Sequence, residues 1–186
     1  LPKQLRAQPL GGLAKHTKSI LWFIQSGDGT TVTLTWRSPS RRAAAAEPGQ
    51  QALAAIWPQL AEDWRRKQLE YTWLRAITQA HTDFWEVTQD GLDWALEKCG
   101  VDDDEELRER LLALYWELQA YPEVPEMLET LQKGGISTAI LSNGSPDMLD
   151  GAVHSAGLGD LLDGVLSVES VGIFKPAPQV YDLVIQ

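Results

Sequence analysis

Cysteine is nearly absent from this chain of 186 residues, which contains only Cys99. A single cysteine cannot form a disulfide within the chain, so we expect a structural or surface thiol and a reducing, cytoplasmic location. Basic residues are also scarce, because 16 Lys and Arg stand against 26 Asp and Glu and give a formal net charge of −10. This acidic balance argues against nucleic acids and anionic membranes as partners.

Long apolar runs are missing as well. The longest near the beginning is Ile20–Ile24, far short of the roughly 20 residues of a membrane-spanning helix and without the pattern of a signal peptide. The three histidines, His16, His81 and His154, show no spacing typical of metal ligands or of a base beside a nucleophile. We therefore expect them to be structural or surface residues.

The middle of the chain has the periodicity of helices. Apolar residues recur at steps of three and four from Gln50 to about residue 75, and this stripe includes the polar residue Gln68. A second helix is predicted over about 88–99, with Thr88 as its N-cap. A third is predicted over Asp103–Gln119, where Tyr115 lies on the apolar stripe and a following Tyr-Pro pair stops the helix.

After residue 121 the pattern changes to alternating strands and helices. We predict a helix over 123–133 that ends at Gly134-Gly135, a strand over Ile136–Leu141, a helix that begins at Ser145-Pro146 and a strand over Gly164–Val168. Such alternation is typical of a parallel sheet flanked by helices. The chain is therefore predicted to be an α/β protein, with a core formed by residues 1–47 and 121–186 and an inserted helical cap over 48–120.

Polar residues follow the strand that ends at Leu141, in the order Ser142, Asn143 and Gly144. In open α/β sheets ligands bind just outside the carboxyl ends of the strands, so this is where a ligand is expected. The alternative is a plain exit from the strand, because Ser and Asn also favour turns.

Three segments now resemble one enzyme family. They are WRRKQLEYTW over 64–73, LSNG over 141–144 and KPAPQVY over 175–181. Together they are similar to the L-2-haloacid dehalogenases of the haloacid dehalogenase superfamily, over about residues 43–186. The resemblance implies a Rossmann-like parallel sheet, and hydrolysis of a small L-2-haloalkanoic acid to the D-2-hydroxy acid and halide without a metal or other cofactor.

The resemblance also implies roles for particular residues. Arg65 and Asn143 would donate to the departing halide, where fixed donors lower the barrier, and Phe84 would form an apolar wall against the alkyl group of the substrate. If there were no such resemblance, Arg65 would be interpreted as one basic residue on a solvated helix face and Phe84 as a core aromatic.

Three more roles follow from the resemblance. Ser142 would bind the substrate carboxylate or steady the nucleophile, and Tyr181 would support the site from the following helix. Lys175 would keep a nucleophilic aspartate ionised, since a nearby positive charge favours the charged form. The alternatives are a loop lysine at the surface and a core tyrosine.

The nucleophile is the weakest part of the resemblance. The family has an aspartate after its first strand, whereas alignment on Gly29-Thr30 puts Ser26 in that place and Asp28 two residues along. We take Asp28 as the nucleophile candidate, because a serine hydroxyl is a poor nucleophile without a base. The later Ser-Ser-Asn…Asp segment of the family would lie beyond Gln186, and the chain starts with Leu1 rather than Met, so we expect a fragment.

Two other functions stay open at this point. One is a Mg²⁺-dependent phosphatase of the same superfamily, which would use Asp28, and the other is a fragment without catalytic activity. The apolar stripe of the first long helix also offers a surface for a homodimer through the cap helices, as in the family that the chain resembles.

Overall fold

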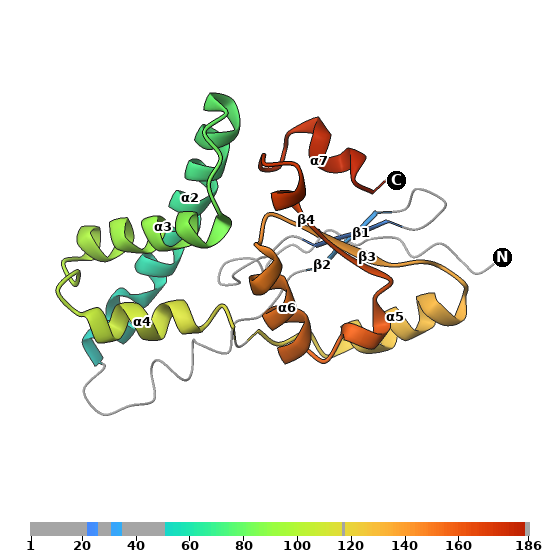
Figure 1. The fold of residues 1–186 in the computed structure, drawn as a ribbon. Helices are drawn as coiled ribbons and strands as arrows, with labels where there is room; N and C mark the ends of the chain where they lie inside the picture. The colour runs from blue at the N-terminus through green and yellow to red at the C-terminus, as the bar shows by residue number, and fades with distance from the viewer. Residues whose placement is uncertain (1–21, 26–30, 35–50, 117, 185–186) are drawn as a thin grey trace.

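A computed structural model describes residues 22–25, 31–34, 51–116 and 118–184, so Ser26 and Asp28 lie outside the described residues. Its elements in chain order are β1 (Trp22–Gln25), β2 (Thr31–Leu34), α2 (Gln51–Thr78), α3 (Phe84–Cys99), α4 (Glu105–Ala113), α5 (Glu123–Lys133), β3 (Ala139–Ser142), α6 (Pro146–Ser155), η2 (Gly159–Leu161), β4 (Gly164–Ser167), η3 (Val168–Ser170) and α7 (Pro178–Asp182). Helices α2, α3 and α4 lie on one side of the strands (Figure 1). Within the described ranges, no helix combines the length and the apolar character that a membrane span requires.

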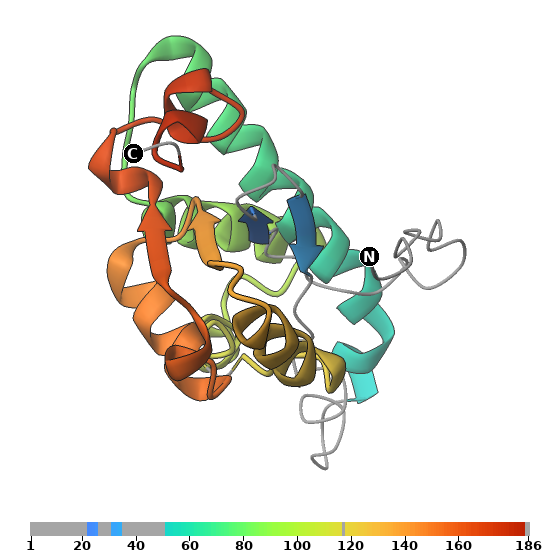
Figure 2. The ribbon, with the colours of Figure 1, turned by 90° about the vertical axis from the view of Figure 1, so that its right-hand side faces the viewer.

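The strands β3 and β4 form the parallel pair that the alternating pattern predicted, although β3 begins at Ala139 and ends at Ser142, whereas the predicted strand covered Ile136–Leu141. Their register runs from Ala139 opposite Gly164 to Ser142 opposite Ser167. Helix α6 connects them, and both strands point toward the end of the molecule that carries α7 (Figure 2). The segments β1 and β2 pair in the antiparallel direction, and β1 lies beside β3.

The local signals around β3 predicted the neighbouring helices well. Helix α5 covers 123–133 as expected, and Gly135 after it has a φ of +71°, a left-handed conformation that favours glycine. Helix α6 has Ser145 as its N-cap and Pro146 in its first turn, also as expected. These ends are set by residues within a few positions, so the sequence alone was sufficient.

Two predicted helix boundaries in the helical block were wrong. Helix α3 begins at Phe84 with Asp83 as its N-cap, whereas Thr88 is buried inside the helix and donates its hydroxyl hydrogen to the Phe84 carbonyl at 2.7 Å. Helix α4 ends at Ala113 instead of Gln119. The reason is that Tyr115 packs in the first apolar cluster with residues of the helical block, whereas Leu118 packs with α5 and α6, so the chain leaves the helix before these two residues and turns from one cluster to the other.

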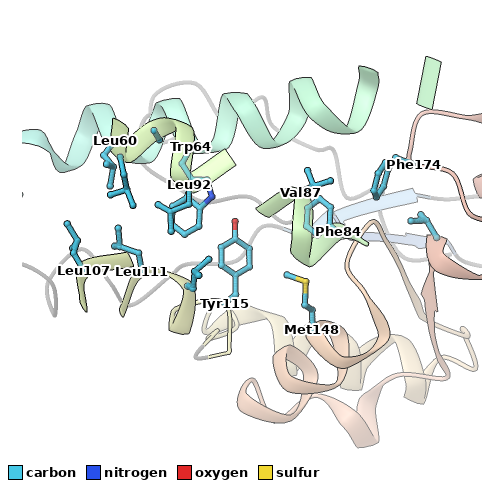
Figure 3. Close-up of a cluster of buried hydrophobic side chains, with 14 of the residues drawn as sticks. Leu60, Trp64, Phe84, Val87, Leu92, Leu107, Leu111, Tyr115, Met148 and Phe174 are labelled. Atoms are coloured by element: carbon cyan, nitrogen blue, oxygen red, sulfur yellow. The ribbon is translucent and has the colours of Figure 1, made fainter. Parts of the chain in front are cut away.

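One apolar cluster joins the helical block to the strands. Its residues from the helical block include Leu60, Trp64, Phe84, Val87, Leu92, Leu107, Leu111 and Tyr115, and those from the other part include Leu141, Met148, Val168, Phe174 and Val180 (Figure 3). A second cluster lies between α5, α6 and β3. The continuous first cluster fixes the helical block against the carboxyl ends of the strands, where a ligand is expected.

Candidate functional site

The tight turn after β3 brings its polar residues to the end of the strand. Ser142 is buried, and its Oγ accepts a hydrogen bond from the backbone N–H of Gly144 at 3.0 Å. A Cβ at position 144 would lie 2.9 Å from Cδ2 of Leu149, so a larger residue here would force the Leu149 side chain to move, and the close approach of α6 favours glycine. Ser142 therefore shapes the turn, and its hydroxyl can still donate one hydrogen bond.

Lys175 is held against the same strand end by hydrogen bonds of both its side chain and its backbone. Its Nζ donates to the carbonyl of Leu141 at 3.0 Å, and its backbone N–H donates to Oδ1 of Asn143 at 3.0 Å. The bond to Oδ1 fixes the orientation of the Asn143 amide, because the two Nδ2 hydrogens then face away from that contact. Lys175 thus belongs to one arrangement with Leu141 and Asn143, although it is more than thirty positions from either of them in the chain.

The positive charge of Arg65 acts on the ammonium group of Lys175. Burial, and to a lesser extent the charge of Arg65, lowers the pKa of the Lys175 ammonium to about 8. Burial also lowers the pKa of the Arg65 guanidinium from its ordinary value. Two partly desolvated cations repel each other, so an anion that binds between them stabilises both. The electrostatics of this site favour an anionic ligand.

A group of buried polar side chains in the helical block contacts Arg65 through Gln68. The Nε2 of Gln68 donates to Oγ1 of Thr88 at 2.7 Å and to the Tyr115 hydroxyl at 3.0 Å, and its Oε1 faces Nη1 of Arg65 at 3.4 Å. Figure 3 shows the Tyr115 hydroxyl pointing toward α2. Burial raises the pKa of Tyr115 to about 12, so the phenol stays neutral.

Gln68 and Tyr115 were not predicted as part of a site. For Gln68 the sequence did contain a signal, because a polar residue on an otherwise apolar helical stripe needs a buried hydrogen-bond partner. Gln68 also follows Arg65 by three residues, which places the two on neighbouring turns of the same helix face.

Two phenylalanines form an aromatic wall beside these groups. Phe84 at the beginning of α3 is 8% exposed, and its ring centroid lies 6.1 Å from that of the fully buried Phe174. Phe174 directly precedes Lys175, so the wall and the ammonium are neighbours in the chain. The predicted role of Phe84 as an apolar surface is compatible with this place and stays a prediction.

The remaining predicted residues have different outcomes. Tyr181 lies on α7 with 39% of its surface exposed, so its supporting role stays a prediction. Asp28, the nucleophile candidate, lies outside the described residues. Ser142, Asn143 and Lys175 meet at the end of β3, and the charge of Arg65 on α2 acts on Lys175. The individual roles of these four residues stay predictions.

The comparison with protein families decides the affiliation of the chain. A model described as haloacid dehalogenase-like hydrolase matches residues 18–186. The chain belongs to this hydrolase family. The match begins well before residue 43, where the motifs alone had placed its start, and it includes the segment around Asp28.

Individual relatives narrow the resemblance to dehalogenases. The chain is 44% identical over 123 residues to (S)-2-haloacid dehalogenase 1 from Pseudomonas sp. strain CBS-3, a match that covers 66% of this chain and 54% of that protein. It is 42% identical over 125 residues to (S)-2-haloacid dehalogenase from Xanthobacter autotrophicus, with 67% and 49% covered. The chain thus spans about half the length of the curated relatives that it matches.

Solved structures give the same result for the fold. L-2-haloacid dehalogenase from Xanthobacter autotrophicus with chloropropionic acid covalently bound is similar at a TM-score of 0.67 and 39% identity, over 77% of this chain and 57% of that one. A dehalogenase crystal structure with an intermediate complex reaches a TM-score of 0.73 at 36% identity, over 81% and 65%. The predicted fold class, a Rossmann-like α/β core of the haloacid dehalogenase type with an inserted helical cap, is confirmed.

Proposed function

We propose that this site hydrolyses the carbon–halogen bond of small L-2-haloalkanoic acids. The observation that carries the proposal is the meeting of two partly buried cations, Arg65 and Lys175, with the fixed amide of Asn143 at the carboxyl end of β3. A 2-haloacid presents a carboxylate and releases a halide, so it places one negative charge in the site at the start and a second as the bond breaks. Preorganised donors and cations stabilise such developing charge without reorganisation.

Each side chain has a place in this reaction. The guanidinium of Arg65 and the Nδ2 hydrogens of Asn143 stabilise the departing halide, and the hydroxyl of Ser142 donates to the substrate carboxylate. Lys175 keeps the attacking carboxylate ionised, for which Asp28 is the candidate. The side chains of Phe84 and Tyr181 complete the pocket around the alkyl group.

The chemistry takes place in two steps. A carboxylate oxygen of Asp28 attacks C2 of the substrate, the carbon–halogen bond breaks with its electron pair on the halide, and the configuration at C2 inverts. Water then attacks the ester carbonyl, which releases the D-2-hydroxy acid and regenerates the carboxylate. The net reaction consumes one water and yields one halide and one proton.

The comparisons favour this reaction over the phosphatase alternative. The relatives described above are dehalogenases, and one solved relative holds chloropropionic acid in a covalent bond. Such a covalent adduct is the kind of species that attack by a protein nucleophile produces. The same chemistry is proposed for this chain.

The decisive experiment measures chloride release from L- and D-2-chloropropionate by the 186-residue chain without added metal. We expect release from the L form only, and a loss of about a hundredfold or more in kcat for Arg65→Gln, since one fixed donor at the developing charge contributes this much. The matched control is Arg66→Gln, because Arg66 is exposed and pairs with Asp63 at 2.5 Å. Equal release from both enantiomers, or equal losses in the two variants, would contradict the proposal.

We further propose that the helical cap, residues 48–120, carries a homodimer contact. Trp73, Leu74 and Ile77 on α2 are 51%, 50% and 80% exposed, an apolar surface that a second copy would cover. The single cysteine supports a cytoplasmic location for such a dimer. Sedimentation equilibrium, which measures the mass of the species in solution, tests the contact. We expect a dimer for the wild type and for the control Thr78→Glu, at an exposed neighbouring position, and a monomer for Ile77→Glu. A wild-type monomer would exclude the contact.

A further inference from the structure

His81 and Glu169 form a bridge across the junction of the two parts of the molecule. Nε2 of His81 lies 2.9 Å from Oε2 of Glu169, although 88 positions separate the two residues. His81 lies in the connection between α2 and α3, and Glu169 lies in η3 directly after β4. An ionised carboxylate only accepts hydrogen bonds, so Nε2 of the imidazole is the donor. No sequence pattern indicated this partner for His81.

The bridge lies directly against the aromatic wall. The imidazole of His81 packs on Phe174 at a centroid distance of 4.6 Å, and Phe174 contacts Phe84 in turn. Phe174 is fully buried and is followed by Lys175, whose backbone N–H donates to Asn143. The position of the His81 ring is therefore transmitted to the residue that carries the site's ammonium group.

The bridge also lowers the stability of the folded protein in a way that two apolar side chains at these positions would not. Nδ1 of His81 and Oε1 of Glu169 are inaccessible to solvent and have no hydrogen-bond partner among the described residues. Buried polar atoms without partners destabilise a protein, whereas two apolar side chains of similar shape would cover the same surface without this loss. A directional bond does what apolar contact does not, since it fixes the orientation of the imidazole on Phe174.

We propose that His81 and Glu169 are a positioning pair for the active site. The pair fixes Phe174 and Lys175 relative to Phe84, and it thereby determines how much room the wall leaves for the alkyl group of the substrate. The consequence for substrate size rests on the proposed dehalogenase function. The consequence for the Lys175 backbone is independent of any activity.

Hydrogen exchange of single backbone amides tests the positioning directly. In His81→Phe the ring on Phe174 is retained and the bridge is lost, and in Glu169→Met the acceptor is removed at similar length. We expect exchange of the Lys175 amide to accelerate about tenfold or more in both variants, the effect of losing one charge-assisted hydrogen bond on local opening. The Val101 amide, which donates to Leu96 at 3.1 Å at the far end of α3, is the internal reference and should change less than about twofold.

Conservative and distant substitutions make the result specific. Glu169→Gln retains an acceptor and should recover part of the protection of the Lys175 amide. Glu129→Gln removes one carboxylate from an exposed pair with Lys133 and should leave exchange unchanged. An unchanged Lys175 amide in both bridge variants, or equal acceleration at Val101, would overturn the proposal, and Glu169→Met decides the matter if His81→Phe does not fold.

The effect of the positioning pair on substrate size is measured by comparing kcat/KM for two substrates that differ by one methylene group. We expect the preference for L-2-chloropropionate over L-2-chlorobutanoate, expressed as the ratio of kcat/KM values, to change about fivefold or more in His81→Phe, because a methylene group is discriminated by the fit of its pocket. A purely structural loss would lower both values equally and overturn the specificity role. If the wild-type chain releases no halide, the proposed function fails, whereas the amide exchange still decides whether the pair positions Lys175.

Discussion

The lowered pKa of Lys175 predicts an unusual dependence of stability on pH. The ammonium is partly buried beside Arg65, and its pKa falls from 10.5 to about 8 in the folded protein. The charged form is therefore less favourable in the folded than in the unfolded chain. Replacing Lys175 with Met removes this ionisation altogether, so the difference between wild type and Lys175→Met isolates its effect.

The sign and the size follow from proton binding. Between pH 8 and pH 10.5 the unfolded chain retains the proton on Lys175 and the folded protein does not, so stability rises with pH in this window. Below pH 8 the cost of the buried charge is present in full. With these two pKa values, the wild type should gain about 2 kcal/mol relative to Lys175→Met between about pH 7 and pH 9.5.

Urea unfolding of the two proteins at several pH values measures this gain. Groups that titrate in both proteins cancel in the difference, and the loss of the Lys175 bond to Leu141 adds a nearly constant offset. Lys133→Met, at an exposed lysine on α5, is the matched control and should track the wild type at every pH. A difference between wild type and Lys175→Met that stays constant with pH would refute the buried-cation argument.

Two further substitutions test the supports of the site. Gln68→Leu removes the buried hydrogen bonds to Thr88 and Tyr115 and should lower the free energy of unfolding, measured by urea titration, by about 2 kcal/mol. The control Gln119→Leu, at an exposed glutamine, should lose less stability. Equal losses in the two variants would mean that the buried hydrogen bonds contribute nothing. Gly144→Ala puts a Cβ 2.9 Å from the side chain of Leu149 and should cost about 1–3 kcal/mol by thermal unfolding, whereas an unchanged midpoint would show that the turn has room.

Elements with strong signals at their own ends could be predicted from the sequence. Helix α5 is such a case, because a proline precedes it and two glycines follow it, and α6 begins with a Ser-Pro pair. The two wrong boundaries have different causes. Helix α3 begins at a local N-cap, Asp83, and the prediction of Thr88 missed this signal, whereas the end of α4 has a tertiary cause. The apolar stripe continues past Ala113, but Tyr115 and Leu118 pack in different cores, and a choice between cores is not visible in a local pattern.

The candidate site divides in the same way. The segments that contain Arg65, Asn143 and Lys175 could be identified because each carries a recognisable motif. The supporting contacts could not, because Gln68 meets Tyr115 across 47 positions and His81 meets Glu169 across 88. Pairing over such distances depends on how the helical block docks on the strands, and only the three-dimensional structure provides it.

The docking of the helical block explains why two cations can be held together before a ligand arrives. Repulsion between Arg65 and Lys175 would push α2 away from β3 if nothing opposed it. The apolar cluster that includes Trp64, Phe84 and Phe174 is continuous across this junction, and burial of such side chains stabilises by about 1.5–3 kcal/mol each. That packing opposes the repulsion between the two cations, so a site with fixed positive charges is formed before a ligand binds, and preorganised charges of this kind are the ones that stabilise developing negative charge most.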